Sequence, residues 1–286
     1  MPATALEAAI RAAALMLVQS FVRYFIRAPK SSVAATAAGR DTAANTGLDL
    51  YREADYFANA LHYHGIVTLF IQIADVLTGP ELRLADTVFR QTDGFEDGAR
   101  TAGRIAKAVK RNEQAKPAGL AADFTALVEK RLMKNDVFRA AARPREFIRI
   151  LLSRYTKGME YGLHSDDAFM DGKRVDLSFT LFLAEPDTYE GGELIIEEPA
   201  GERFVKLNAG SLVLYPSTTL HRVAEVTSGE RRAAVGWVRS LVRGAEERET
   251  LFDVALALRQ AEAAGDRALT DRLLKIQGSL LRRWGD

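Results

Sequence analysis

Cysteine is absent from this chain of 286 residues. The absence excludes a disulfide framework, a thiolate metal site and a thiol nucleophile. Histidine is scarce as well, with four residues in all. Any metal site must therefore draw on this small set together with carboxylates. Hydrophobic residues make up 48% and charged residues 27% of the chain, which is ordinary globular composition with enough apolar material for a sizeable core.

A strong net charge and a long hydrophobic run are also missing. The formal charge is +1, from 39 basic and 38 acidic residues, so no global field attracts nucleic acid or an anionic membrane. The apolar stretch from Ala12 to Ile26 is interrupted by Arg23 and falls short of the roughly 20 residues that span a bilayer. We expect a cytoplasmic protein with no nucleic-acid partner and no membrane partner.

The chain divides into four regions that differ in composition and in the spacing of apolar residues. Residues 1–66 are alanine-rich without a sustained strand pattern, and we expect a poorly ordered extension. Residues 67–144 begin with a strand-like run and then show helical spacing, which indicates a helical support. Residues 145–243 carry short runs of β-formers separated by turn residues, and residues 244–286 return to helical spacing.

Two helices are predicted before the β-rich region. Thr78 can cap a helix from about Pro80 to Gln91, with Glu81 reaching back to the cap. A second amphipathic helix runs from Leu120 to Asn135. Between the two helices, a basic stretch is expected to form a solvated rim at the substrate entrance. It contains Arg100, Arg104, Lys107, Lys110 and Arg111.

The β-rich region contains eight closely spaced strands, which is the number in a jelly roll. The predicted strands are Phe147–Tyr155, Leu163–Asp166, Val175–Ala184, Glu193–Glu197, Arg203–Leu207, Ser211–Tyr215, Leu220–Val226 and Arg231–Val242. Gly191 and Gly192 are expected to form a hairpin turn. Two closing helices should pack against the sandwich and offer a surface for a homodimer. The predicted fold is mainly β with flanking helices around a double-stranded β-helix (jelly roll).

A candidate metal site lies in this region. His164 and Asp166 are two residues apart, so in an extended segment both side chains project from one face. His221 opens a later strand and can arrive beside them. Two histidines and one carboxylate that leave coordination positions open are the ligand set of non-haem iron(II) oxygenases. A His-x-Asp tripeptide alone is weak evidence, because a lone histidine is more often a hydrogen-bonded structural residue.

Arg231 follows His221 by ten residues and can bind a carboxylate through its planar fork. In strand geometry Arg231 and Arg232 face opposite ways, so one of them points inward. Two solvated arginines are the alternative interpretation. Tyr155 is a candidate to hydrogen-bond a co-substrate, although an aromatic residue in a strand is more often core filling. Ser178 and Thr180 share a strand face and can line the same pocket.

Several segments together resemble the bacterial PKHD-type hydroxylases, which are related to prolyl and lysyl hydroxylases. They are the stretch from Arg154 to Asp166, Asp176–Leu183, Gly191–Leu194, His221–Val223, the Val109–Gln114 segment and the closing Leu280–Trp284. The resemblance implies iron(II) bound by His164, Asp166 and His221, and 2-oxoglutarate bound by Arg231 rather than Arg232. It further implies O2 as co-substrate and L-ascorbate as the reductant of oxidised iron.

The expected reaction is hydroxylation of a substrate coupled to conversion of 2-oxoglutarate to succinate. Apart from the metal centre, no catalytic residue is predicted. The substrate itself stays open between a small molecule and a peptidyl group, because a family name is not evidence about this pocket. The main alternative is a non-catalytic jelly-roll module that binds metal. A halogenase is disfavoured because Asp166 occupies the place that chloride would take, and a cupin-like dioxygenase would need more histidines.

Residues 1–66 have no counterpart in the family as the resemblance defines it. Members tend to begin near the strand at Val67, where the sequence texture changes. We therefore expect that the native product starts close to Val67, which a valine initiator codon would allow. His62 and His64 lie in this extension and are given no role.

Overall fold

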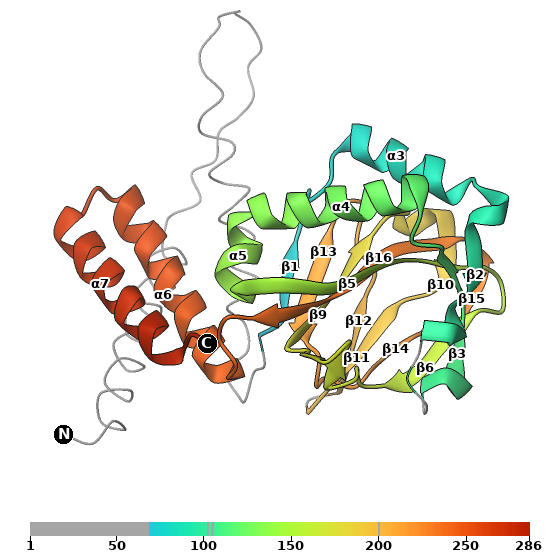
Figure 1. Ribbon diagram of the computed structural model, residues 1–286. Coiled ribbons are helices and arrows are strands. Elements are labelled where there is room, and N and C mark those ends of the chain that lie inside the picture. The colour runs from blue at the N-terminus through green and yellow to red at the C-terminus, as the bar shows by residue number, and fades with distance from the viewer. Residues whose placement is uncertain (1–68, 102, 104–105, 200) are drawn as a thin grey trace, which may run out of the picture.

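The computed structural model describes residues 69–101, 103, 106–199 and 201–286. The predicted extension 1–66, including His62 and His64, lies outside the described residues. Two β-sheets face one another, and helices flank them (Figure 1). The prediction of a mainly β jelly roll with flanking helices is confirmed.

The larger sheet has seven strands in the order β1-β13-β9-β16-β5-β4-β2. Its strands are β1 Ile71–Ile73, β2 Phe95–Asp97, β4 Glu113–Ala115, β5 Pro144–Tyr155, β9 Leu177–Phe182, β13 Leu212–Pro216 and β16 Arg231–Ser240. All the pairings are antiparallel, and β16 lies between β9 and β5. This central strand carries Arg231 at its first position.

The smaller sheet has five strands in the order β12-β11-β14-β6-β3. Its strands are β3 Lys110–Arg111, β6 Glu160–His164, β11 Leu194–Glu198, β12 Gly201–Val205 and β14 His221–Val223. Two short pairs complete the β-structure. They are β7 Phe169–Met170 with β8 Lys173–Arg174, and β10 Tyr189–Gly191 with β15 Val226–Gly229. The predicted strand Leu220–Val226 is therefore divided between β14 and the start of β15.

Three helices, α3 Gly79–Phe89, α4 Gly119–Lys134 and α5 Asp136–Ala142, lie along the outer face of the larger sheet (Figure 1). The first two match the predicted helices. The capping box at the start of α3 is present: the Glu81 carboxylate accepts a hydrogen bond from the Thr78 backbone N–H at 2.9 Å. Asn135 caps α5 by accepting a hydrogen bond from the Phe138 N–H.

Alternation along the strands separates two hydrophobic cores. On β9, Leu177, Phe179 and Leu181 pack against α4 and α5 in one core. The alternate residue Phe182 belongs to a second core between the two sheets. Ser178 and Thr180 point the same way as Phe182, toward the pocket. A polar patch on the inner face of a buried strand is therefore what positions the site.

The closing helices are α6 Ala245–Ala263 and α7 Arg267–Trp284. Helix α6 packs on α5 and contributes Phe252 to the core under the helices. Helix α7 packs on α6 and has no buried side chain, so the prediction that both helices pack against the sandwich is wrong for α7. The two helices form a hairpin beside the sheets (Figure 1).

The Gly191–Gly192 segment is not the predicted hairpin turn, because it connects β10 to β11 in a different sheet. Both glycines have positive φ, +69° and +66°. A Cβ atom on Gly191 would lie 2.0 Å from the Glu225 carbonyl oxygen. The segment therefore needs glycine both for its backbone conformation and for close approach to the neighbouring strand.

In the part of the chain that the structure describes, no helix combines the length and the apolar character that crossing a membrane requires.

Candidate functional site

Antiparallel pairing of β14 with β6 places His221 directly opposite His164. Residues opposite one another in a sheet project from the same face. The two imidazole ring centroids are 4.3 Å apart. Asp166 lies beyond the end of β6 instead of within it as predicted, and its backbone N–H donates to the Ser217 carbonyl at 3.2 Å. One potential ligand atom from each of His164, Asp166 and His221 falls within 4.8 Å of the others.

Hydrogen bonds fix which ring nitrogen faces the shared space. Nδ1 of His164 lies 2.8 Å from the Gly162 carbonyl oxygen, and Nδ1 of His221 lies 2.9 Å from that of Thr219. A carbonyl only accepts, so each Nδ1 carries the proton and each Nε2 keeps its lone pair free for a metal. Burial, and then the neighbouring His221, lowers the pKa of His164 to about 4. The neutral form that binds a metal is therefore favoured.

The Asp166 carboxylate is oriented by hydroxyl groups. Ser178 Oγ donates to Asp166 Oδ2 at 2.5 Å, and the Ser178 and Ser217 hydroxyls lie 2.7 Å apart. Both serines are buried. Hydrogen bonds of this kind hold a ligand carboxylate in one orientation before the metal binds. Ser178 was predicted to line the pocket, but its contact with Asp166 was not predicted.

Aromatic side chains pack against both imidazoles. The Tyr161 ring stacks on His164 with 3.7 Å between centroids, and Tyr215 meets His221 edge-on at 5.1 Å. Burial and the nearby Asp166 charge raise the pKa of each tyrosine above its usual range. Both hydroxyls are therefore neutral at physiological pH and add no negative charge to the site.

Arg231 and Arg232 face opposite sides of β16, as predicted. Arg231 is 1% exposed, and its Nε donates to the Gly192 carbonyl at 2.8 Å. Its two terminal nitrogens have no hydrogen-bond partner among the described residues. Arg232 is partly exposed and pairs with Asp86 and Glu230. A buried guanidinium with both terminal groups unpaired is costly unless a ligand satisfies it, and the matching ligand is a carboxylate.

Tyr155 lies beside this guanidinium, which is 5.2 Å from the centre of its ring. Burial raises the pKa of Tyr155 to about 12, against the opposing influences of the Arg231 charge and the Asn112 amide. Its hydroxyl is therefore a neutral donor at physiological pH. Asn112 is 4% exposed and also lines the pocket.

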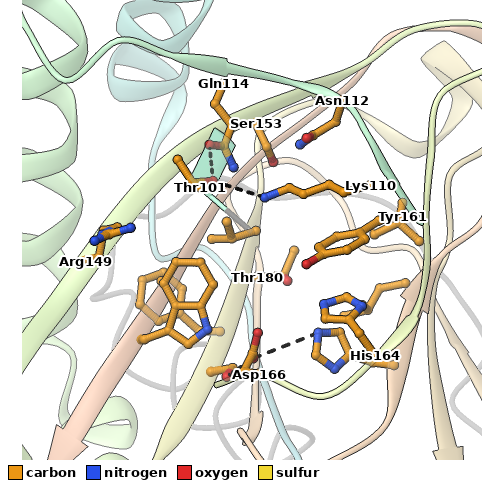
Figure 2. Close-up of a pocket in the computed structure, with 18 of the residues that line it drawn as sticks. Thr101, Lys110, Asn112, Gln114, Arg149, Ser153, Tyr161, His164, Asp166 and Thr180 are labelled. Carbon is orange, nitrogen blue, oxygen red and sulfur yellow. Dashed lines mark hydrogen bonds and ion pairs between the residues drawn. The ribbon is translucent and has the colours of Figure 1, made fainter. Parts of the chain in front are cut away.

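One pocket connects these groups. It is lined by the three candidate ligands, Arg231, Tyr155, Ser178 and Thr180, together with Lys110, Asn112, Gln114, Arg149 and Trp237 among others. Figure 2 shows His164 and Asp166 at one end and Lys110 reaching toward Thr101 and Gln114 at the other. Lys110 and Trp237 were not predicted as pocket residues. Asp167 also borders the pocket.

The donor set fits a divalent transition metal. Two neutral imidazoles and one carboxylate on one side leave the other coordination positions free, which suits iron(II). The unpaired Arg231 fork in the same pocket fits a dicarboxylate co-substrate that reaches from the metal to the guanidinium.

Comparisons with known proteins agree with this chemistry. The model of the 2OG-Fe(II) oxygenase superfamily matches residues 150–239. A PKHD-type hydroxylase of Parvibaculum lavamentivorans is 84% identical over 218 residues, covering 76% of this chain and 100% of the relative. One from Acaryochloris marina is 46% identical over 220 residues, again covering 76% of this chain and 100% of the relative.

Among solved structures, a prolyl hydroxylase of Trichoplax adhaerens, in complex with a peptide fragment of the hypoxia inducible factor, is similar with a TM-score of 0.49. It is 18% identical, and the match covers 72% of this chain and 97% of that chain.

Proposed function

The chain belongs to the PKHD-type hydroxylases of the 2OG-Fe(II) oxygenase superfamily, and we propose that it hydroxylates a C–H bond of its substrate at iron held by His164, Asp166 and His221. Membership in this superfamily makes it an iron(II)- and 2-oxoglutarate-dependent dioxygenase. In the proposed reaction, substrate, 2-oxoglutarate and O2 yield hydroxylated substrate, succinate and carbon dioxide. The hydroxylated substrate and succinate each keep one oxygen atom of O2.

The observation that carries this assignment is the coexistence of two ligand-binding groups in one pocket. Three ligand atoms converge within 4.8 Å, and a buried guanidinium keeps both terminal nitrogens unpaired among the described residues. A metal-binding module without turnover has no need of the second group. A 2-oxoglutarate-dependent enzyme needs both, because its co-substrate carries a chelating 2-oxo acid at one end and a carboxylate at the other.

Each residue has a proposed task that its surroundings support. His164 and His221 offer Nε2 to the metal, because their Nδ1 protons are taken by backbone carbonyls. Asp166 supplies the negative ligand. Arg231 receives the distal carboxylate of 2-oxoglutarate, and Tyr155 donates a hydrogen bond to the same co-substrate.

Iron(II), once bound, supplies the oxidative chemistry, and the residues around it position substrates and exclude water. The inner faces of both sheets close the pocket with buried side chains, including Leu194 and Tyr215. Water exclusion protects the oxidation from unproductive side reactions. Ascorbate as the reductant that restores iron(II) is part of the same proposal and rests on family membership alone.

Anaerobic titration of the purified protein with iron(II) and then 2-oxoglutarate tests the proposal. The expected result is the weak visible charge-transfer band of the chelate, which disappears in His221→Ala. In Arg231→Ala it should form only at much higher 2-oxoglutarate concentration. Iron binding without a chelate band in the wild type would support a non-catalytic metal-binding module instead.

A further inference from the structure

Lys110 is a buried cation whose ammonium enters the pocket. The residue belongs to β3 at the edge of the smaller sheet and is 8% exposed. Lysine is seldom buried to this extent unless a negative partner compensates its charge. Figure 2 shows the side chain crossing above Tyr161 toward Thr101. The basic stretch that contains Lys110 was expected to be solvated, and for this residue the expectation is wrong.

Among the described residues, the groups that Lys110 contacts directly are neutral. Its Nζ donates to Thr101 Oγ1 at 3.3 Å and lies 5.0 Å from the centre of the Tyr161 ring. An ammonium has three donors, so most of its hydrogen-bonding capacity is unused by these contacts. Asp166 and Asp97 act on it electrostatically, but neither forms an ion pair with it. Burial lowers its pKa to about 8, which leaves it mainly protonated at neutral pH.

The hydroxyl of Thr101 is oriented to support this charge. It donates to Gln114 Oε1 at 2.7 Å and so presents a lone pair to the ammonium. Gln114 itself is 2% exposed. Lys110, Thr101 and Gln114 therefore form a connected polar cluster that holds the ammonium in the pocket instead of letting it reach solvent.

The cluster lies close to the proposed iron site. The centroids of the Tyr161 and His164 rings are 3.7 Å apart, and the Lys110 ammonium lies 5.0 Å from the Tyr161 centroid. A single aromatic ring therefore links the ammonium to a candidate metal ligand. A small molecule bound to Lys110 could therefore reach the three candidate metal ligands. That spacing suits a substrate rather than a remote docking partner.

Lys110 and Arg231 have different contacts in this pocket. Lys110 contacts Thr101 and the ring of Tyr161. Arg231 contacts Gly192, Tyr155 and Phe182 instead. One pocket thus has two buried cations with different neighbours, and 2-oxoglutarate has one distal carboxylate to offer.

We propose that Lys110 binds a carboxylate of the primary substrate, and that the enzyme oxidises a C–H bond of the same molecule. The proposal rests on the proposed function, because it assumes that iron and 2-oxoglutarate fill the rest of the pocket. It assigns the substrate class as carboxylic acids, either small free acids or the C-terminus of a peptide.

Binding of matched acids and amides to the anaerobic complex with iron(II) and 2-oxoglutarate tests this assignment. The probes are N-acetyl amino acids and short peptides ending in the same residues, each with a free or an amidated C-terminus. The fluorescence of Trp237, which lines the pocket, reports binding. The chain has two tryptophans, so every protein also carries Trp284→Phe.

Three variants at two positions distinguish carboxylate binding by Lys110 from a general effect of positive charge in this segment. Lys110→Met keeps the length and apolar stem of the side chain without its charge, and Lys110→Arg keeps the charge. Arg111→Met removes the adjacent cation, which is exposed and pairs with Glu160 outside the pocket. The chelate band and the thermal unfolding midpoint are measured for all of them, which controls for loss of the fold or of the co-substrate site.

The expected result is that at least one acid binds about tenfold tighter than its amide, a difference of about 1.4 kcal/mol. The preference should disappear in Lys110→Met and persist in Lys110→Arg and Arg111→Met. Preference among small acids alone identifies a free acid, and preference among peptides as well identifies a chain terminus.

Three outcomes would overturn the proposal: no acid is bound better than its amide, the preference survives in Lys110→Met, or Lys110→Met weakens 2-oxoglutarate binding instead. The last result would assign Lys110 to the co-substrate. Failure of the proposed function is distinct, since the wild type would then form no chelate band before any acid is added.

Discussion

Replacing Arg231 by methionine should weaken 2-oxoglutarate binding without destabilising the protein. The guanidinium is 1% exposed and has two terminal nitrogens without a partner among the described residues. Removing one member of a desolvated, hydrogen-bonded charge pair costs about 2–5 kcal/mol or more in binding. Taking about 3 kcal/mol, the Kd for 2-oxoglutarate should rise roughly 150-fold.

The same substitution should leave the free energy of unfolding unchanged within about 1 kcal/mol, or raise it, because replacing buried charge by an apolar side chain is often neutral or stabilising. The hydrogen bond from Nε to Gly192 is lost, which offsets part of that gain. Weaker 2-oxoglutarate binding together with an unchanged or higher free energy of unfolding would identify Arg231 as a binding group and not a structural one.

Anaerobic titration of the iron(II) protein, followed through the chelate band, measures the affinity, and urea unfolding of the metal-free protein measures stability. Arg232→Met is the matched control, since its side chain pairs with Asp86 and Glu230 on the other side of β16. 2-Oxobutanoate, which lacks a distal carboxylate, should bind equally to wild type and Arg231→Met. If Arg231→Met binds 2-oxoglutarate within about threefold of the wild type, the guanidinium does not hold the distal carboxylate.

Three further predictions concern the metal ligands and the glycine segment. Ser178→Ala, which removes the hydrogen bond to Asp166, should lower iron(II) affinity about 10- to 100-fold in a metal titration, and unchanged affinity would show that the hydroxyl does not orient the ligand. Burial lowers the pKa of His164 from 6.5 to about 4, so between these pH values the unfolded chain binds more protons than the folded protein. The urea midpoint of the metal-free protein should therefore fall as the pH decreases from 6.5 toward 4. This fall in the urea midpoint should be smaller in His164→Asn. An equal dependence on pH in the two proteins would contradict the role given to His164. Gly191→Ala should cost about 2 kcal/mol more than Gly158→Ala in urea unfolding, because both have positive φ but an added Cβ would lie 2.0 Å from a backbone oxygen only at Gly191. Equal losses of stability in Gly191→Ala and Gly158→Ala would show that the close approach at Gly191 adds nothing to the cost of the substitution.

Local patterns predicted most of the fold because the forces that create those patterns are themselves local. The capping box at Thr78 and Glu81 satisfies the first backbone N–H groups of α3, and the structure has it as predicted. Alternation on β9 and β16 follows from strand geometry, so the inward direction of Ser178 and Arg231 was also predictable.

Features that depend on distant partners were not predicted. A lysine in a basic stretch is normally solvated, and burial of Lys110 arises only because β3 pairs with β6 beside Tyr161. Gly191 and Gly192 resemble a hairpin turn locally, yet they connect strands of different sheets. The α7 helix has helical spacing of apolar residues, but these meet α6 rather than the sandwich.

The candidate metal ligands were predicted as a set although each signal was weak. His164 and Asp166 share a short motif, and His221 was added by its place at the start of a later strand. The direct opposition of His221 and His164 in the β14–β6 pairing supplies the geometry that spacing alone left open. The hydroxyl contact to Asp166 comes from Ser178 on β9, which is linked in turn to the Ser217 hydroxyl, and this arrangement had no recognisable local signal.

The most direct test of 2-oxoglutarate-dependent oxygenase activity at this metal site is to follow the oxygen atoms of O2 during turnover. Protein loaded with iron(II) and 2-oxoglutarate without O2 is exposed to oxygen gas carrying the heavy isotope, and the succinate is analysed by mass spectrometry. Succinate with one heavy oxygen atom is expected from the wild type, and none above background from His221→Ala. Absence of labelled succinate from a wild-type protein that binds iron and 2-oxoglutarate would contradict this activity.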